Sequence, residues 1–156
     1  MTLLDPKTVD LIGLPVAATN YHQAIEWIQA AALSGDRAYA VEAANTHVAA
    51  LARHDQSFGE VMAKFDLICP DGMPLVWLLN QQLKQSEKLT DRVYGPTLML
   101  QTIEASENQQ DLKHFFFGGS ADTLNKLEKR FSEDFPNADI TGTYSPPFGT
   151  WPADEL

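Results

Sequence analysis

Short apolar segments alternate with segments of helical periodicity along most of the chain, and this alternation constrains the fold more than any other feature. It predicts one strand within 9–17 that leaves through a turn at Gly13 and Pro15. It also predicts strands at 38–45 and within "DLICP", "HFFFGG" and "ADITGTY". It predicts helices between them, including 73–83, 96–105 and 121–131. Strands that alternate with helices form a mainly parallel sheet covered on both faces. We therefore predict an α/β fold with such a sheet.

The first helix, within 20–36, carries the clearest local signals. Asn20 and Gln23 have the spacing of a capping box, and Gly35 suits the C-terminal end. Five apolar residues fall on one face at helical spacing: Ala24, Ile25, Ile28, Ala31 and Ala32. We predict that this face packs on the sheet as the first crossover helix.

The length and composition indicate one folded domain that spans 1–156. A chain of 156 residues can bury its own core, and 44% hydrophobic with 21% charged residues is typical of globular proteins. The final residues, "YSPPFGTWPADEL", hold a Pro-rich turn and the acidic start of a helix whose body does not follow. We therefore expect a chain that is truncated at its C-terminus.

The net charge of −10 argues against nucleic acid as a partner, because phosphates repel an acidic surface. The basic residues Lys126, Lys129 and Arg130 alternate with acids on a helix, which is typical of a solvated face. The sequence shows no signal peptide pattern and no run of about 18 apolar residues. We expect a cytoplasmic protein.

The single cysteine, Cys69, excludes an intramolecular disulfide. Its apolar surroundings favour a buried inert thiol, and a nucleophile is the alternative. His22, His54 and His114 do not have the spacing of metal ligands. The sequence predicts no metal and no cofactor.

Four segments carry the polar residues that a functional site needs. We call them strand exits, because each is predicted to lead from the carboxyl end of a strand toward the next helix. Parallel α/β sheets bind ligands outside the carboxyl ends of their strands. The four exits are "EAANTH" (42–47), "CPDGMP" (69–74), "DRVYGPT" (91–97) and "FFGGSADT" (116–123). We therefore place the candidate site residues in these segments.

Asp71 stands in the second exit, between Pro70 and Gly72, where the chain is predicted to turn sharply. One interpretation is an N-cap, in which the carboxylate accepts a backbone N–H of the following helix. The other is a general base or a ligand-binding acid. The two roles compete, because a carboxylate whose oxygens accept capping bonds is a weak base.

Arg92, in the exit at 91–97, and Asn45, in the exit at 42–47, can each be interpreted in two ways. Arg92 either clamps a phosphate with its bidentate fork or pairs with Asp91 or Glu87 at the surface. Asn45 either hydrogen-bonds a sugar or base edge, or it caps the following helix, a role that Thr46 could fill instead.

Gly118 and Gly119 join a predicted strand to a helix whose predicted N-cap is Ser120. Two glycines let a diphosphate approach the backbone closely, and the helix dipole favours its charge. The segment has neither the GxGxxG spacing of a dinucleotide site nor the lysine of a P-loop. A plain tight turn is the alternative.

As a set, these exits resemble the N-terminal half of the WecG/TagA/CpsF family of glycosyltransferases. The matching pieces are "IGLPVAATNYHQAIEWI", "EAANTHVAALARHDQSFGEVMAKFDLICPDGMPLVWLLN", "LTDRVYGPTLML" and "HFFFGGSADTLNKLEKRFSEDFPNADITGTYSPPF". The resemblance implies a Rossmann-like sheet and a metal-independent, inverting transfer of an N-acetylhexosamine. It implies a UDP-sugar donor and a polyprenyl-diphosphate-linked acceptor at the inner membrane face, in teichoic acid, cell-envelope or exopolysaccharide synthesis.

The resemblance also assigns roles to residues. The family's proposed catalytic base, the Asp of "PDG", corresponds to Asp71, and the Arg of "RVxG" corresponds to Arg92, near the diphosphate. Ala43 replaces the threonine of the family's "TxN" exit, and Thr97 replaces an acid that follows "RVxGx". We predict one catalytic residue, Asp71. We predict as substrate-binding residues Asn45, Thr46, Arg92, Gly118 and Gly119.

The resemblance covers only the N-terminal half of the family's proteins. Family members continue into a second half with a "GxPxQE"-like motif and a basic tail, neither of which occurs in this sequence. We expect peripheral association with the membrane, and we leave homo-oligomer formation open, because apolar surface that a second half would cover could drive it. The alternative function is a nucleotide-binding or assembly module that has lost catalysis. An unrelated α/β nucleotide enzyme ranks third.

Overall fold

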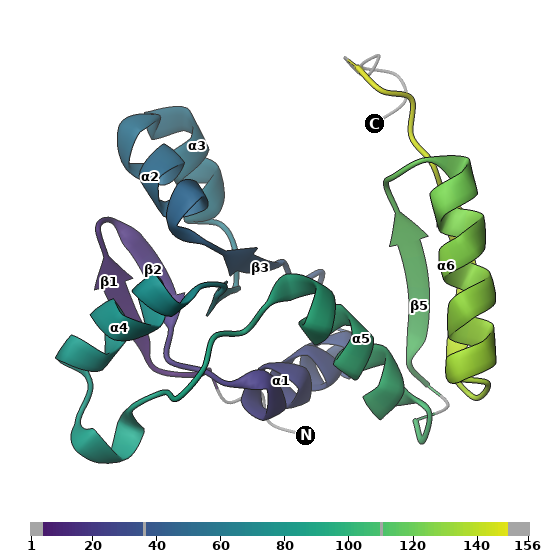
Figure 1. Cartoon of the computed structure of the whole chain (residues 1–156), viewed down its shortest axis with the longest axis horizontal. Coiled ribbons are helices and arrows are strands. Elements are labelled where there is room, and N and C mark those ends of the chain that lie inside the picture. Colours follow the sequence, from purple (N-terminus) through teal and green to yellow (C-terminus); the bar gives the residue numbers. More distant parts are fainter. Residues whose placement is uncertain (1–4, 36, 110, 150–156) are drawn as a thin grey trace. The chain divides into compact units, whose positions relative to one another are not determined.

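The computed structural model describes residues 5–35, 37–109 and 111–149 of the chain (Figure 1). These residues form two compact units, one that ends at Thr102 and one that begins at Ile103. The predicted start of a last helix, within 151–156, lies outside the described residues.

The first unit holds four strands and most of the helices. In chain order its elements are β1 (Thr8–Leu11), β2 (Leu14–Ala17), α1 (Tyr21–Ser34), β3 (Val41–Ala44), α2 (Thr46–His54), α3 (Gln56–Met62), β4 (Leu67–Pro70), α4 (Met73–Gln82), a 3₁₀ helix (Gln85–Glu87) and the start of α5 (Gly95–Ser106). β3 and β4 are parallel, with Val41 opposite Leu67 and Ala44 opposite Pro70. The carboxyl ends of these two strands therefore meet at one edge.

The segment 9–17 is an antiparallel hairpin of β1 and β2, so the prediction of one strand leaving through a turn is wrong. Ile12 and Gly13 turn the chain with positive φ values of 55° and 92°. Asp10 supports this turn, since its carboxylate accepts the Gly13 N–H at 2.9 Å. A β-branched residue at positive φ is rare, which explains why the sequence did not signal a two-residue turn here.

The predicted α/β class is confirmed. In place of the predicted single, mainly parallel sheet, the described residues form two-stranded sheets. The described residues contain six α-helices, two parallel strand pairs (β3–β4 and β5–β6) and one antiparallel pair (β1–β2). The described residues therefore form an α/β arrangement with small sheets.

β4 is buried because helices pack on both of its faces. Ile68 lies in one cluster with Leu79 of α4, whereas Leu67 and Cys69 lie in another with Trp27 of α1. A strand covered on both faces is expected to be apolar throughout, as this one is. Burial raises the pKa of the Cys69 thiol to about 12, and the charge of a nearby glutamate adds to the shift. The thiol therefore stays protonated, which agrees with the inert interpretation.

The predicted capping box and C-terminal glycine of α1 are confirmed, but the buried face of the helix differs from the predicted one. The Asn20 side chain accepts the Gln23 N–H at 3.0 Å, the Gln23 side chain accepts the Asn20 N–H, and Gly35 ends the helix at a φ of 65°. Trp27 is buried whereas Ala32 is exposed. The buried face is therefore centred closer to Trp27 than the apolar spacing predicted.

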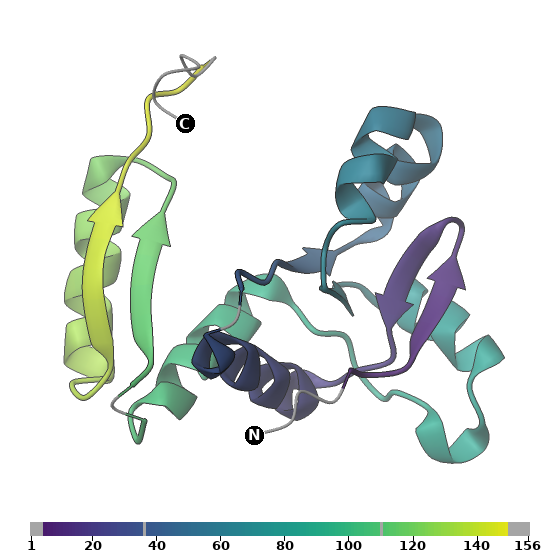
Figure 2. The ribbon, with the colours of Figure 1, turned by 180° about the vertical axis from the view of Figure 1, so that it is seen from behind.

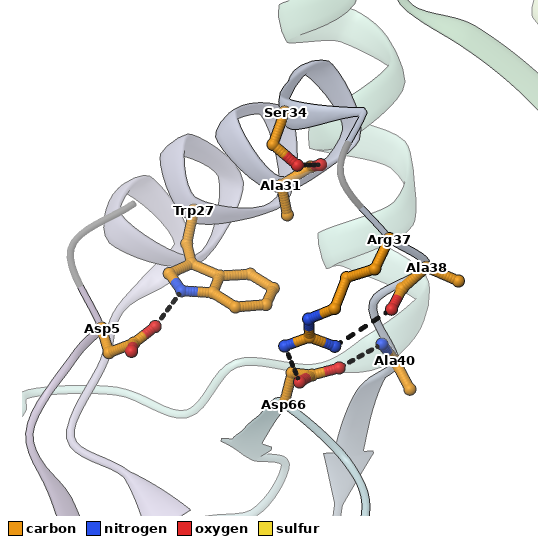
Figure 3. A network of polar contacts seen from close by, with 8 residues as sticks. All are labelled: Asp5, Trp27, Ala31, Ser34, Arg37, Ala38, Ala40 and Asp66. Atoms are coloured by element: carbon orange, nitrogen blue, oxygen red, sulfur yellow. Dashed lines mark hydrogen bonds and ion pairs between the residues drawn. The ribbon is translucent and has the colours of Figure 1, made fainter. Parts of the chain in front are cut away.

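A polar network joins the segments around α1 and β4 (Figure 3). The Trp27 indole N–H donates to Asp5 at 3.0 Å. One oxygen of Asp66 accepts a hydrogen bond from Arg37 at 2.6 Å, and the other accepts the Ala40 N–H at 2.8 Å. Because Asp66 directly precedes β4 and Ala40 directly precedes β3, these bonds help to align the two parallel strands.

The second unit contains the end of α5, β5 (Lys113–Phe117), α6 (Ala121–Asp134) and β6 (Asp139–Tyr144). α6 lies against one face of the parallel β5–β6 pair (Figure 2). Phe116 of β5 packs there against Leu124 and Phe131 of α6. The opposite side of α6 carries exposed ion pairs between residues four apart, which confirms the predicted solvated face.

His114 gives the second unit a predicted pH dependence. Its Nε2 lies 2.7 Å from the Ser106 hydroxyl, which itself donates to the Ile103 carbonyl at 2.6 Å. Burial lowers the pKa of His114, although the Asp139 charge opposes this shift. Because the unfolded chain then binds the proton at higher pH than the folded chain, stability is expected to fall as the pH drops through the ordinary histidine range.

Urea unfolding at pH 7 and pH 5 measures this dependence. We expect His114→Gln to reduce the loss of stability between the two pH values, whereas His54→Gln, at an exposed position, is expected to retain the full loss. An unchanged pH dependence in His114→Gln would refute the assignment.

Candidate functional site

Asp71 directly follows β4 and lies at the carboxyl ends of the parallel strands. Its backbone N–H donates to the Ala44 carbonyl at the end of β3 at 2.8 Å. Its side chain is 13% exposed, so the carboxylate is mostly enclosed yet reaches solvent. This is the edge at which parallel sheets bind ligands.

Asp71 does not cap the helix that follows it. The N-cap of α4 is Gly72, and the described residues provide no side-chain cap for this helix. Pro74, the second residue of α4, has no N–H to offer, and the Leu75 N–H donates to the Gly72 carbonyl at 3.1 Å. The capping interpretation is therefore wrong, and the carboxylate is available for other contacts.

Arg92 extends its guanidinium toward Asp71. The distance from Arg92 Nη1 to Asp71 Oδ1 is 3.8 Å, and the Arg92 side chain is 45% exposed. Glu87, one of its predicted partners, pairs with Lys7 at 2.9 Å, and Asp91 accepts the backbone N–H of Arg92 at 2.7 Å. A half-exposed ion pair of this length contributes little to the stability of the fold.

The start of α5 also approaches Asp71. The Gly95 N–H donates a long hydrogen bond of 3.5 Å to Asp71 Oδ2. A side chain at position 95 would lie within 3.2 Å of the Ala43 Cβ, so glycine permits this close approach. The carboxylate thus lies near two sources of positive charge, namely the guanidinium of Arg92 and the N-terminus of α5.

Glu42 is a further acid, not predicted from the sequence, that feels the charge of Asp71. It is half-buried on β3, and burial raises its pKa, with a further increase from the charge of Asp71. The charge of Asp71, which follows β4, therefore acts on the carboxyl group of Glu42, the second residue of the neighbouring strand β3. An acid inside the apolar strand "AVEAA" was the signal that could have identified it.

Asn45 and Thr46 connect β3 to α2. The Asn45 side-chain oxygen accepts the N–H groups of His47 and Val48 at 2.9 and 3.1 Å. The capping interpretation is therefore confirmed for Asn45, with the cap made by the oxygen and not the amide nitrogen. Thr46 is the first residue of α2 and is exposed.

Gly118 and Gly119 turn the chain from β5 into α6 in the second unit, at φ values of 112° and 77°. The Gly118 N–H donates to the Tyr144 carbonyl at 3.0 Å, and Ser120 caps α6 by accepting the Thr123 N–H at 3.2 Å. The predicted cap is thus confirmed. An open hollow beside this turn is lined by Gly119, Ser120, Ser145, Pro146, Pro147, Phe148 and Gly149.

The structure brings Asp71 and Arg92 together in the first unit, and it places Asn45 after β3, whose end is hydrogen-bonded to Asp71. Gly118 and Gly119 belong to the second unit. Across 5–35, 37–109 and 111–149, no group of three His, Cys or acidic residues is arranged to hold a metal ion. Over the same residues, every helix is too short or too polar to cross a membrane.

The family model described as "Glycosyl transferase WecG/TagA/CpsF family" matches residues 9–156, nearly the whole chain. This chain belongs to that family. It is also similar to the N-acetylglucosaminyldiphosphoundecaprenol N-acetyl-beta-D-mannosaminyltransferase of Bacillus subtilis (strain 168), with 19% identity over 136 residues. That match covers 87% of this chain and 52% of the relative, so the chain spans about half the length of the relative.

Membership of the WecG/TagA/CpsF family confirms the resemblance drawn from the strand exits. The two departures from its expected pattern can now be placed. Ala43 packs against the start of α5 at Gly95, so this contact is apolar where the pattern has a hydroxyl. Thr97 is half-buried in the first turn of the same helix. Ala43 therefore faces the first turn of α5 and Thr97 lies in it, and Gly95 of the same turn donates its N–H to Asp71.

Proposed function

We propose that this chain serves in the transfer of an N-acetylhexosamine from a UDP-sugar to a polyprenyl-diphosphate-linked sugar. Family membership supports a glycosyltransferase, and the name of the Bacillus subtilis relative supports this class of sugar and acceptor. One structural observation carries the proposal. The Asp71 carboxylate does not cap α4, the helix that follows it, and it lies beside Arg92 at the carboxyl ends of two parallel strands.

Asp71 serves as the general base in the proposed reaction. The acceptor hydroxyl oxygen attacks the anomeric carbon while its proton passes to the Asp71 carboxylate. The bond from the anomeric carbon to the diphosphate oxygen breaks, and UDP leaves with the electron pair. This single displacement inverts the anomeric configuration. Arg92 offsets the charge that develops on the diphosphate, so we propose a metal-independent reaction.

The remaining predicted site residues complete this proposal. The amide nitrogen of Asn45 and the hydroxyl of Thr46 are proposed to contact the sugars, since the Asn45 cap uses only the oxygen. Gly118 and Gly119 are proposed to let a phosphate approach the turn before α6, where the Gly118 N–H is already bonded to Tyr144. We also propose that 1–156 forms one glycosyltransferase-like domain with a Rossmann-like sheet, which is the N-terminal part of the family's catalytic unit.

The setting of the reaction is part of the same proposal. A polyprenyl acceptor resides in the membrane, so the protein would act in the cytoplasm and associate peripherally with the inner face of the cytoplasmic membrane. The products would be cell-envelope polymers such as teichoic acids or exopolysaccharides. Formation of a homo-oligomer is a further proposal, which sedimentation would test.

Titration calorimetry with UDP tests the role of Arg92. We expect Arg92→Ala to weaken UDP binding by about tenfold or more, because it removes a hydrogen bond to a charged group. Arg53→Ala, at an exposed position near the end of α2, is the matched control and is expected to bind like the wild type. The affinity should be the same with and without EDTA. Equal affinity of Arg92→Ala and the wild type would contradict the proposal.

A further inference from the structure

Two consecutive backbone groups fix the segment 92–95 to different parts of the first unit. The Val93 N–H donates to the Pro70 carbonyl at 2.8 Å, and the Tyr94 N–H donates to the Tyr21 hydroxyl oxygen at 2.9 Å. The Val93 side chain is completely buried. The backbone that carries Arg92 is therefore held both by β4 and by a side chain of α1.

The Tyr21 hydroxyl is a well-defined anchor. Tyr21 is the first residue of α1 and directly follows the capping residue Asn20. The capping box therefore fixes the backbone of Tyr21. The side chain is half-buried against the apolar cluster that contains Trp27 and Val93. Its bond to the Tyr94 N–H joins residues 73 positions apart in the sequence. Folding of α1 therefore determines where Tyr94 lies.

The Tyr94 ring lies against the guanidinium of Arg92. The guanidinium carbon is 4.7 Å from the ring centre, within the range of a cation–π contact. The same guanidinium lies 3.8 Å from the Asp71 carboxylate. A half-exposed arginine samples many rotamers, and an aromatic face restricts them by stacking on the planar group.

We propose that Tyr94 is a positioning residue, anchored by the Tyr21 hydroxyl, that holds the Arg92 guanidinium beside Asp71 where a diphosphate binds. This inference rests on the proposed function, in which Arg92 binds the diphosphate of the donor. Tyr94 acts through Arg92 and needs no contact with substrate. The stacking contact requires the aromatic ring of Tyr94, whereas its backbone N–H makes the bond to Tyr21.

Calorimetry with UDP and NMR titration with uridine test the inference. Tyr94→Leu is expected to weaken UDP binding by about two- to fivefold, the range of an exposed cation–π contact. Tyr94→Phe keeps the ring and is expected to bind like the wild type. Uridine has no phosphate, so its binding should not change in any of these variants. Tyr39→Leu is the matched control and is expected to bind UDP like the wild type. It removes a similar stacking contact, in which the guanidinium carbon of Arg37 lies 3.9 Å from the centre of the Tyr39 ring.

Each outcome separates the inference from the function on which it rests. Weaker UDP binding by Arg92→Ala together with unchanged binding by Tyr94→Leu would overturn the inference and leave the proposed function intact. Equal weakening by Tyr94→Leu and Tyr94→Phe, or a parallel loss of uridine binding, would also overturn it. Unchanged UDP binding by Arg92→Ala would instead overturn the proposed role of Arg92.

Discussion

Replacement of Asp71 by asparagine is expected to lower the rate of sugar transfer by about 10²- to 10⁴-fold, the usual contribution of a general base. The amide has nearly the shape of the carboxylate but cannot accept the proton of the acceptor hydroxyl. Binding of UDP should not weaken, because the substitution removes a negative charge beside Arg92. The rate is measured with a labelled donor, and the affinity is measured by calorimetry on the same preparation.

Two controls make the Asp71 result specific. Asp122→Asn replaces an exposed acid that pairs with Lys126 on α6 and is expected to keep the full rate. Glu42→Gln tests the second carboxyl group of the site, whose pKa is raised by burial and by Asp71. If Glu42→Gln loses transfer while Asp71→Asn retains it, the base has been assigned to the wrong carboxylate.

Replacement of Leu79 by alanine is expected to destabilise the first unit by about 2–5 kcal/mol, because it opens a cavity in a closed core. Leu79 lies on α4, is 0% exposed and packs in the same cluster as Ile68 of β4. The neighbouring Leu78 is 40% exposed. Leu78→Ala should therefore cost less than about 1 kcal/mol.

The comparison of Leu79→Ala with Leu78→Ala uses one residue type on adjacent positions of one helix. Urea unfolding followed by circular dichroism gives the free energy of unfolding of each variant. Equal destabilisation by both variants would contradict the packing described for α4.

The helices could be predicted closely because their signals are local. The capping box at Asn20 and Gln23 marks the start of α1, and Ser120 marks the start of α6. The hairpin of β1 and β2 was harder to predict, because Ile12 occupies a turn position with a φ of 55° that usually favours glycine or asparagine. An apolar residue in the turn made two strands look like one.

The candidate site was predictable in position but not in its contacts. Asp71 could be selected because it follows a buried strand, as ligand-binding residues of parallel sheets do. Whether it caps α4 depended on Pro74 and on the bond made by the Leu75 N–H, which only the structure shows. The contact of Tyr21 with Tyr94 joins distant segments, so no local pattern could have indicated it.

The proposed transfer of a sugar by this chain, with Asp71 as the base, can be tested with a single assay. The chain is incubated with labelled UDP-N-acetylhexosamines and a polyprenyl-diphosphate-linked N-acetylglucosamine, and the lipid product and released UDP are measured. We expect a labelled disaccharide lipid, with one UDP released for each sugar transferred, from the wild type but not from Asp71→Asn. Binding of the donor without any labelled lipid would contradict it and would favour a nucleotide-binding module that has lost catalysis.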